Sequence, residues 1–206
     1  MSRNRAPRRR SYRRRAALLT AVAAAGALTT TACSGSGSSS SGSGNTNYVT
    51  GSTGISAVAK ADRQPAPKLD GETLEGKPLN VDDFKGKVVV LNVWGSWCTP
   101  CRAEAKHLAK AARDTKPKGV EFVGINTRDN SKQSAIEFEK KFGVTYPSLY
   151  DPIGKLMLRF PKGTLNPQAI PSTIVLDKDG KIAARTLAAV SEEQLRKMID
   201  PLIAEK

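Results

Sequence analysis

Apolar and polar residues follow regular patterns from about residue 61 to the C-terminus. The run Val88–Trp94 is almost continuously apolar and rich in β-branched residues, which indicates a strand buried on both faces. Residues 120–125 predict a second strand of this kind. Between the two, residues 102–114 have inward-facing positions at steps of three and four, the spacing of an amphipathic helix. These positions begin at Cys101 and continue with Glu104, Ala105, Leu108 and Ala112.

The C-terminal half predicts another helix, a hairpin and a last helix. Apolar residues at helical spacing stop at Gly143, a typical helix C-cap. Residues 173–176 and 181–187 flank the turn sequence Asp-Lys-Asp-Gly, which indicates an antiparallel hairpin. Ser191 and Gln194 form a capping-box signature that opens the last helix. The order of elements predicts an α/β fold whose mixed central sheet contains a parallel pair and an antiparallel hairpin, flanked by helices.

A short extension precedes these elements. Residues 68–71 and 74–77 place turn residues between short apolar positions, which predicts an N-terminal hairpin. Residues 61–206 form a stretch of about 145 residues, enough for one domain with a proper hydrophobic core.

The first 60 residues differ in composition from the rest. Residues 1–15 contain eight arginines and no acidic residue, and residues 16–32 are apolar and rich in alanine. This order is typical of an export signal, and the apolar run is too short and too weakly hydrophobic for a persuasive membrane-spanning helix. We therefore predict a signal peptide over residues 1–32. Residues 33–60 contain a Ser/Gly-rich tract and are predicted to be a flexible tether.

Cys33 is a candidate lipidation site. Residues 29–33 read Thr-Thr-Thr-Ala-Cys and resemble a bacterial lipobox, in which the cysteine is diacylated and the chain is cut before it. Ala32 fits that pattern, whereas Thr30 stands where a leucine is preferred. The hypothesis is a protein anchored by lipid at the extracytoplasmic face of the cell membrane, with a secreted protein as the alternative. The arginine pairs leave Sec and twin-arginine export both open.

The net charge of +14 does not indicate nucleic-acid binding. Eight of the 33 basic residues lie in the signal, which leaves 25 against 19 acidic residues, or +6, for the mature chain. The remaining lysines are scattered and do not form a stripe with aromatic residues. We expect a solvated basic surface with, at most, a weak attraction to anionic membranes.

The residues with the clearest chemistry are Cys98 and Cys101, in the sequence Cys-Thr-Pro-Cys between the first strand and the first helix. A dithiol at a helix N-terminus is suited to disulfide exchange, because the free N–H groups and the helix dipole stabilise a thiolate. An inert structural disulfide is the alternative. A metal site is disfavoured because Cys33 is remote and His107 is the only histidine, and covalent haem attachment would need a histidine where Arg102 stands.

Three blocks around this dithiol, residues 86–104, 146–151 and 170–180, carry a resemblance to a known family. With them, residues 65–206 resemble thioredoxin-fold proteins of the redoxin/AhpC-TSA superfamily, and specifically the exported, membrane-tethered thiol-disulfide oxidoreductases of the TlpA/ResA type. A peroxiredoxin-like peroxidase would need a Thr-x-x-Cys motif, which Ser96 and Trp97 do not provide.

The resemblance implies a role for each residue of the motif. Cys98 would be the exposed nucleophile that forms a mixed disulfide with the partner, and Cys101 the resolving thiol that attacks it. Pro100 would tune the stability of the thiolate, and Trp97 and Thr99 would form part of the partner-binding surface. Trp94 is predicted to be a core residue, and His107 is predicted to be a surface residue of the helix.

Residues on both sides of the dithiol complete the implied site. Asn92 stands where thioredoxin has a buried aspartate, and Glu104 lies on the inward face of the helix, three residues after Cys101. Burial would raise the pKa of Glu104 and make it a candidate proton acceptor for Cys101, with an exposed glutamate as the alternative. Pro171 resembles the cis-proline that faces the dithiol in this fold, so that Ile170 would present its backbone to a substrate segment.

The resemblance implies an extracytoplasmic oxidoreductase without a cofactor, which exchanges electrons with cysteine pairs of exported proteins. A reductant would serve substrates such as apocytochrome c and would need a membrane electron donor of the CcdA/DsbD type. A disulfide-forming oxidant and a non-catalytic binding lipoprotein are the alternatives. The loop of residues 161–169 is longer than the short link usual in the family, and we hypothesise that it shapes partner choice.

Overall fold

The computed structural model describes residues 48–205. The predicted signal peptide of residues 1–32, Cys33 and the Ser/Gly-rich tract that follows it lie outside the described residues. No helix within residues 48–205 is long and apolar enough to cross a bilayer.

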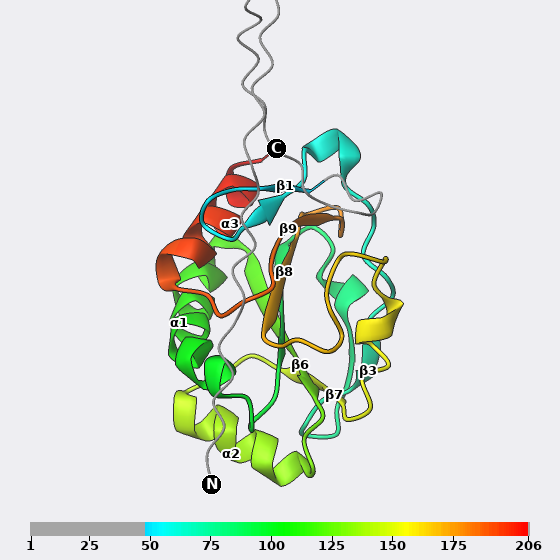
Figure 1. Ribbon diagram of the computed structural model, residues 1–206, viewed down its shortest axis with the longest axis vertical. Coiled ribbons are helices and arrows are strands. Elements are labelled where there is room, and N and C mark those ends of the chain that lie inside the picture. Colours follow the sequence, from blue (N-terminus) through cyan, green and yellow to red (C-terminus); the bar gives the residue numbers. More distant parts are fainter. Residues whose placement is uncertain (1–47, 206) are drawn as a thin grey trace, which may run out of the picture. The chain divides into compact units, whose positions relative to one another are not determined.

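The described part is built on a seven-stranded mixed sheet (Figure 1). The order of its strands is β1-β2-β9-β8-β5-β6-β7. Neighbours β5, β6 and β7 run parallel, whereas β8, β9, β2 and β1 join by antiparallel pairing. The strands are β1 Val49–Thr50, β2 Ser56–Ala57, β5 Val88–Trp94, β6 Val120–Thr127, β7 Ser148–Asp151, β8 Ser172–Leu176 and β9 Ile182–Thr186.

The sheet confirms the predicted α/β class and the hairpin of β8 and β9, and it adds a third parallel strand. The sequence predicts only a parallel pair, but β7 pairs with β6 from Gly124↔Ser148 to Thr127↔Asp151. This strand has four residues, too few to show a hydrophobic period. The helix α2 that leads from β6 to β7 is predicted, but helical spacing does not show that the chain then returns to pair with β6.

The domain also starts earlier than the predicted boundary at residue 61. Part of the predicted tether forms β1 and β2, which extend the sheet beyond β9 through the pairs Ser56↔Arg185 and Ala57↔Ala184. Each of these strands has only two residues in a Gly- and Ser-rich stretch, so local propensity gives no signal for them. Pairing of β2 with the edge of β9, and of β1 with β2, stabilises them instead.

Three α-helices match the predicted ones, and each begins at a capping side chain. The Cys98 sulfur accepts the backbone N–H of Cys101 at the start of the first helix, and Ser191 and Gln194 form the predicted capping box of the last. Gly143 ends the second helix with a φ of 68°, the left-handed conformation that favours glycine. The helices are α1 Thr99–Thr115, α2 Lys132–Phe142 and α3 Glu192–Ala204.

The predicted N-terminal hairpin is present as a separate two-stranded sheet of β3 (Asp70–Glu72) and β4 (Pro78–Asn80). It is connected to the main sheet by a bridge between Thr73 and Leu149. Short 3-10 helices occupy the connections, namely η1 Lys60–Asp62, η2 Val81–Phe84, η3 Lys116–Lys118 and η4 Met157–Arg159.

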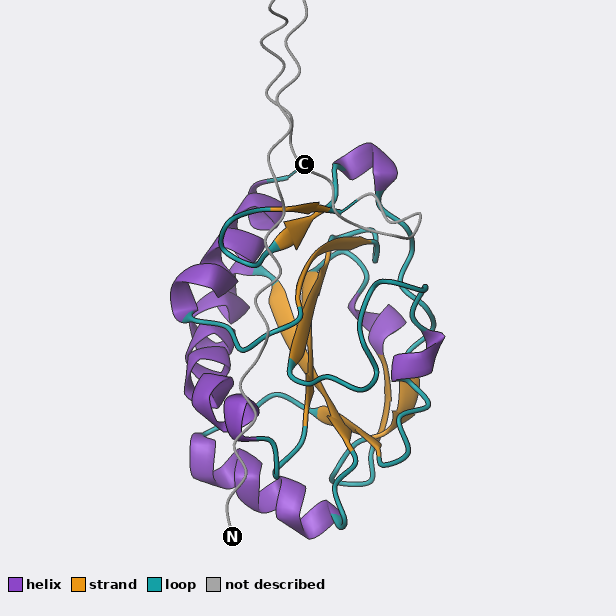
Figure 2. Ribbon diagram, in the orientation of Figure 1, coloured by secondary structure: helices purple, strands orange, loops and turns teal. Residues whose placement is uncertain are grey.

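The main sheet is buried on both faces. The side chains of its central strands point alternately into two hydrophobic clusters, one on each face. Val88 and Val90 of β5 pack with residues of α1 and α3, the helices that cover one face (Figure 2). Val89, Leu91 and Val93 point to the other face.

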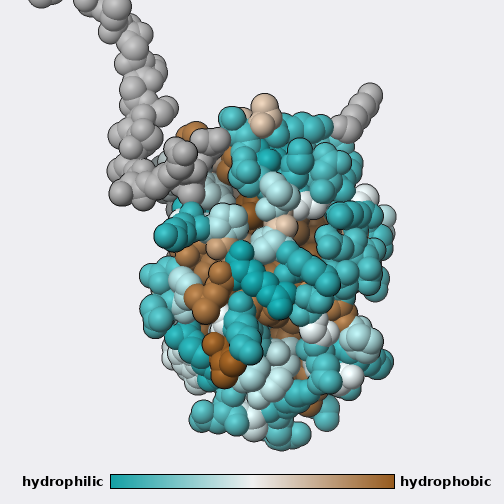
Figure 3. All heavy atoms as spheres, turned by 90° about the vertical axis from the view of Figure 1, so that its right-hand side faces the viewer, coloured by the Kyte–Doolittle hydropathy of each residue, from teal (hydrophilic) through white to brown (hydrophobic). Residues whose placement is uncertain are grey.

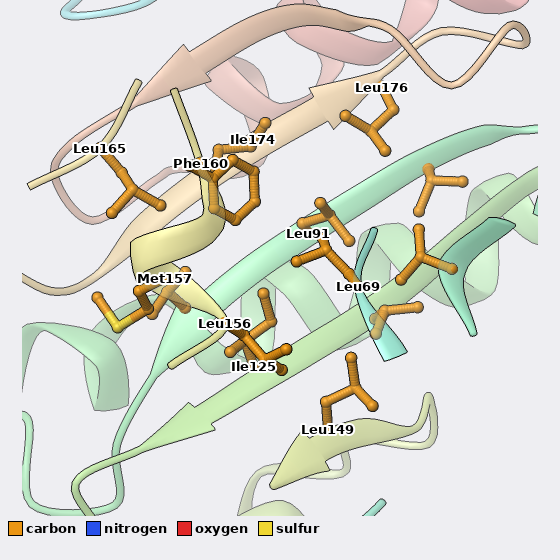
Figure 4. Packing of buried hydrophobic residues seen from close by; sticks show 14 of the residues in the cluster. Leu69, Leu91, Ile125, Leu149, Leu156, Met157, Phe160, Leu165, Ile174 and Leu176 are labelled. Atoms are coloured by element: carbon orange, nitrogen blue, oxygen red, sulfur yellow. The ribbon is translucent and has the colours of Figure 1, made fainter. Parts of the chain in front are cut away.

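That second face is covered by connections and the small hairpin in place of long helices. Figure 4 shows side chains of β5, β6 and β8 meeting Met157, Phe160 and Leu165 from the loop after β7. Figure 3 looks onto this side, where apolar atoms show between polar segments. A strand with continuous apolar residues is therefore required at the centre of the sheet, as the sequence predicts for β5.

Candidate active site

The dithiol lies where β5 ends and α1 begins. Cys98 and Cys101 form a disulfide with an S–S distance of 2.02 Å, and the Cys101 N–H donates to the Cys98 sulfur at 3.2 Å. Pro100 occupies the first turn of α1, where its missing N–H leaves no helical hydrogen bond unmade. The backbone N–H of Cys101 at this helix start is therefore directed at the Cys98 sulfur, where it would stabilise a thiolate.

Cys98 is less accessible than the sequence analysis expects. Its residue exposure is 3% and that of Cys101 is 1%, so the prediction of an exposed Cys98 is wrong for this disulfide form. Cys98 is buried by residues distant in the sequence, because it lies in a hydrophobic cluster with Trp94 and Phe138, against which Ile170 packs. The exposed residues of the motif are instead Trp97, Thr99 and Pro100.

The loop before β8 supplies the wall beside the disulfide. The peptide bond between Ile170 and Pro171 is cis. The Cys98 sulfur lies 3.8 Å from the Ile170 carbonyl oxygen. The structure thus brings Ile170, with its cis bond to Pro171, beside the Cys98 sulfur, as the sequence analysis expects.

Glu104, three residues after Cys101 in α1, is buried, with 1% of its surface exposed. Its Oε1 accepts a hydrogen bond from Asn92 Nδ2 at 2.8 Å, and its Oε2 accepts the backbone N–H of Val190 at 2.9 Å. Burial raises the pKa of Glu104 to about 7, while the hydrogen bonds from Val190 and Asn92 oppose the rise by favouring the ionised form. The carboxyl group can therefore gain or lose a proton near neutral pH.

A small cavity adjoins Cys101 on the side of Asn92. It has a volume of about 10 Å³, about enough for one water molecule, and Tyr146 also lines it. Burial and the negative charges of Glu104 and Glu139 raise the pKa of Tyr146, so its hydroxyl stays protonated. Asn92 and Tyr146 thus share the lining of this cavity with Cys101.

The sequence analysis missed a carboxylate that holds the loop before Cys98. Asp129 accepts the Ser96 backbone N–H at 2.9 Å and the Ser96 hydroxyl, and it also accepts Asn126 Nδ2 at 2.6 Å. Arg102 holds the same loop from the helix side, because its Nη1 donates to the Ser96 carbonyl at 3.1 Å. These contacts fix the backbone from which Trp97 and Cys98 project.

A signal for this cluster was present in the sequence. Residues 126–129 read Asn-Thr-Arg-Asp directly after the second buried strand. Because β5 and β6 are parallel, their carboxyl ends meet at one edge of the sheet, and polar residues there are candidates for a site. The pattern alone did not show which of them would face Ser96.

The remaining predicted residues lie as follows. Trp97 is 51% exposed, and the Arg128 guanidinium carbon lies 5.1 Å from its ring centroid. Trp94 is a core residue, and its Nε1 donates to Ser148 Oγ at 3.3 Å. His107 is exposed on α1. Among residues 48–205, no group of three or more His, Cys, Asp or Glu side chains is arranged to hold a metal ion.

Comparison with known proteins places this site in a family. The Redoxin family model matches residues 59–199. The thiol-disulfide oxidoreductase ResA of a Bacillus cereus strain is 32% identical over 130 residues, which cover 63% of this chain and 72% of ResA.

Solved structures agree with this match. A DsbF homologue from Corynebacterium diphtheriae superposes with a TM-score of 0.68 at 39% identity, covering 74% of this chain and 95% of that one. A secreted thiol-disulfide isomerase from Corynebacterium glutamicum gives a TM-score of 0.69 at 36% identity, with 74% and 93% covered. The expected thioredoxin-like fold is confirmed.

Proposed function

The chain belongs to the redoxin family as a thiol-disulfide oxidoreductase of the ResA type, and we propose that it reduces disulfides of exported proteins outside the cytoplasm. The observation that carries this proposal is a buried Glu104 with a pKa of about 7, three residues after Cys101 in α1 and hydrogen-bonded to Asn92, which lines the cavity adjoining Cys101. A proton acceptor with this pKa can take the proton that Cys101 must lose before it can act as a nucleophile.

The proposed reaction moves two electrons from the dithiol to the substrate. The Cys98 thiolate attacks one sulfur of the substrate disulfide, whose S–S bond breaks, and the other substrate sulfur leaves as a thiolate that takes up a proton. Cys101 then transfers its proton to Glu104 and attacks the Cys98 sulfur. The mixed disulfide breaks, the second substrate thiolate leaves, and the enzyme returns to the disulfide form seen in the structure.

Ile170 and Pro171 give the substrate its place in this reaction. The Ile170 carbonyl lies beside the Cys98 sulfur, and Pro171 has no N–H that would pair with its own chain. An extended substrate segment can therefore add its backbone along this loop in the manner of a short strand. Its disulfide would then lie beside Cys98, with Trp97, Thr99 and Pro100 exposed around it.

The direction of electron flow and the substrates rest on the resemblance to the TlpA/ResA type. It implies a reductant that acts on exported proteins, apocytochrome c among them, and that receives electrons from a membrane donor of the CcdA/DsbD type. A reductant is expected to have a reduction potential of about −270 mV, whereas a disulfide-forming oxidant has one of about −120 mV.

The place of action rests on the sequence before the described residues. The export signal and the lipobox-like Cys33 support a lipid anchor at the outer face of the membrane. The C. glutamicum isomerase is called secreted, which agrees with an exported protein. Incorporation of labelled fatty acid in the wild type and its loss in Cys33→Ser would support the anchor, and an unlabelled wild type would favour secretion.

The decisive experiment is trapping. The Cys101→Ser variant should stall at the mixed disulfide, and mass spectrometry of the trapped proteins from whole cells should identify exported proteins with cysteine pairs. A potential measured near that of the oxidants, or trapping of cytoplasmic proteins only, would overturn the proposal. The Cys98→Ser variant is the matched control, because it lacks the nucleophile and should trap nothing.

A further inference from the structure

A second buried carboxyl group takes no part in the proposed reaction. Glu139, in α2, is 7% exposed, and its Oε1 accepts a hydrogen bond from the Ser148 hydroxyl at 2.6 Å. Burial raises the pKa of Glu139 to about 7, while the Ser148 hydrogen bond opposes this rise and the negative charge of Glu75 adds to it. Glu139 therefore gains or loses its charge in the same pH range as Glu104.

Three neighbouring elements bring titratable or charged groups toward Glu139 or its helix. Glu75 lies in the turn between β3 and β4, Tyr146 precedes β7, and Arg102 of α1 contacts α2 through two aromatic rings. Among residues 48–205 the carboxyl group of Glu139 has Ser148 as its hydrogen-bond donor, and no Lys or Arg forms an ion pair with it. The hydrogen bond from Ser148 is therefore the direct contact that holds the ionised carboxylate.

Ser148 connects Glu139 to Trp94. The Trp94 indole Nε1 donates to the Ser148 hydroxyl oxygen at 3.3 Å. An indole N–H can only donate, so the hydroxyl oxygen is the acceptor there, and the hydroxyl hydrogen is left for Glu139. The direction of both hydrogen bonds is thus fixed, from Trp94 through Ser148 to the carboxyl group.

Gly124 leaves the room that this chain of hydrogen bonds needs. It pairs with Ser148 in the sheet, and an added Cβ would overlap Ser148 Oγ and lie 2.7 Å from Trp94 Nε1. On the helix side, Phe138 stacks on the indole with ring centroids 4.4 Å apart. The indole is therefore enclosed between β6 and α2, and its position depends on close packing and on the hydrogen bond to Ser148.

Trp94 joins this chain to the dithiol. It lies in one hydrophobic cluster with both cysteines, and it lines the cavity that adjoins Cys101. Tyr146 lines the same cavity, and its pKa is raised by burial and by the negative charges of Glu104 and Glu139. A change of charge at Glu139 thus acts on side chains that surround the resolving cysteine.

We propose that Glu139 positions Trp94 against the dithiol through Ser148 and thereby couples the redox state of the dithiol to its own protonation. This inference rests on the proposed function and adds a positioning residue to the same site. An ionised Glu139 makes a charge-assisted hydrogen bond with Ser148, which strengthens the bond from the Ser148 oxygen to the indole N–H. The carboxylate therefore supports the arrangement of Trp94 that the disulfide form has, and protonation weakens this support.

The coupling has a definite sign. Reduction adds two electrons from a dithiol donor and one proton to the disulfide, which gives a Cys98 thiolate and a Cys101 thiol. A proton on Glu139 weakens the support for the disulfide form and favours reduction, so by linkage reduction raises the affinity of Glu139 for a proton. The negative charge of the thiolate acts in the same direction.

The first measurement follows the indole N–H signal of Trp94 by NMR between pH 5.5 and 8.5, in the disulfide form and after reduction with dithiothreitol. The chain has two tryptophans, and a spectrum of Trp97→Phe assigns their signals. In the disulfide form the Trp94 signal should titrate with a midpoint near 7. Reduction should raise this midpoint by about half a pH unit, a weak charge coupling.

Most of this titration should disappear in Glu139→Gln and in Ser148→Ala. Glutamine keeps an oxygen that can accept the Ser148 hydroxyl, so the first variant should fold, and the second carries the same test if it does not. The matched control is Glu137→Gln, which removes the same charge from the exposed face of α2, two residues away. It should titrate like the wild type.

The second measurement is the equilibrium constant for reduction by dithiothreitol at pH 5.5 and pH 8.5. A midpoint raised by about half a unit makes this constant fall about threefold more between the two pH values in the wild type than in Glu139→Gln. Glu104 and the cysteines titrate in both proteins, so the comparison isolates Glu139. In the Ser148→Ala background, Glu139→Gln should change the constant by about 1.5-fold or less.

Four results would overturn the inference. They are a Trp94 signal that titrates equally in the wild type and in Glu139→Gln, one midpoint for both redox forms, an equal loss in Glu137→Gln, and a full effect of Glu139→Gln in the Ser148→Ala background, which would mean that only the charge acts. Neither measurement uses a protein substrate. A wild type that reduces no substrate disulfide would therefore refute the proposed function, while these titrations still decide the role of Glu139.

Discussion

Asn92 Nδ2 donates a hydrogen bond of 2.8 Å to Glu104 Oε1, which joins the central strand of the sheet to the helix that carries the dithiol. Both side chains are buried, at 3% and 1% exposure. The amide cannot titrate, so the pair contains one proton-accepting group. The hydrogen bond moderates the pKa of that group and keeps it in the range where a thiol can be deprotonated.

Glu104→Gln should slow turnover at neutral pH and change its pH dependence. The turnover rate of the wild type should rise with pH through a midpoint near 7 as Glu104 ionises, and this rise should be absent in the variant. General base catalysis typically contributes at least about 100-fold, so a loss of roughly that size is expected at pH 8. Steady-state reduction of insulin between pH 5.5 and 8.5 checks it, and an identical profile would rule out the role.

Asn92→Ala should shift the pH-dependent rise in the turnover rate to higher pH. Without the donor, the ionised form of Glu104 loses a hydrogen bond, so its pKa should rise above that of the wild type, by about one unit. Asn80→Ala serves as a control, because Asn80 caps η2, away from the dithiol. A shift of this rise to lower pH would show that Asn92 does not stabilise the carboxylate.

Folding stability should decrease as pH rises from about 4.5 to about 7. Burial raises the pKa of Glu104 and of Glu139 to about 7, so in this window the folded chain binds more protons than the unfolded chain. The contribution of these two carboxyl groups to the free energy of unfolding is complete below about pH 4.5 and is lost as pH rises through about 7. For Glu104 alone the change corresponds to about 3 kcal/mol. Urea titrations at several pH values should show this slope in the wild type and a flatter one in Glu104→Gln.

Arg63→Met should destabilise the domain without a direct effect on the redox site. Arg63 pairs with Asp177 at 3.1 Å and with Glu205 at 2.6 Å, and its side chain is 6% exposed. Removing it leaves a buried carboxylate without its cation, a loss of about 3 kcal/mol in the free energy of unfolding. The matched control is Arg159→Met, whose partner Asp70 is exposed, and a much smaller change is expected there. Equal losses would contradict the argument.

Arg185→Met should loosen the loop of residues 161–169. Arg185 Nη1 donates to the Thr164 carbonyl, and its guanidinium carbon lies 3.9 Å from the Tyr48 ring centroid. Hydrogen exchange in this loop should become more than about tenfold faster, with no change in β5. The hypothesis that the loop shapes partner choice then predicts a lower kcat/KM on a protein substrate, and unchanged turnover in a variant that lacks the loop would contradict it.

The sequence determined much of this protein by itself. Continuous β-branched residues in β5, helical spacing in α1 and the capping residues of α2 and α3 reflect local preferences and burial, which short stretches of sequence encode directly. The dithiol was evident for the same reason, because its two cysteines and the helix start are neighbours in the chain. The inward position of Glu104 followed from its spacing after Cys101.

Only the tertiary structure decided what surrounds these residues. The burial of Cys98 depends on Ile170, which is 72 residues away, and Glu104 accepts from Val190, which is 86 residues away. Strands β1, β2 and β7 are too short to show a period, and they exist because neighbouring strands offer hydrogen bonds. Long-range pairing and burial set the pKa of Glu104 and leave two nitrogens of Arg128 without an acceptor, and neither can be read from the chemistry of adjacent residues.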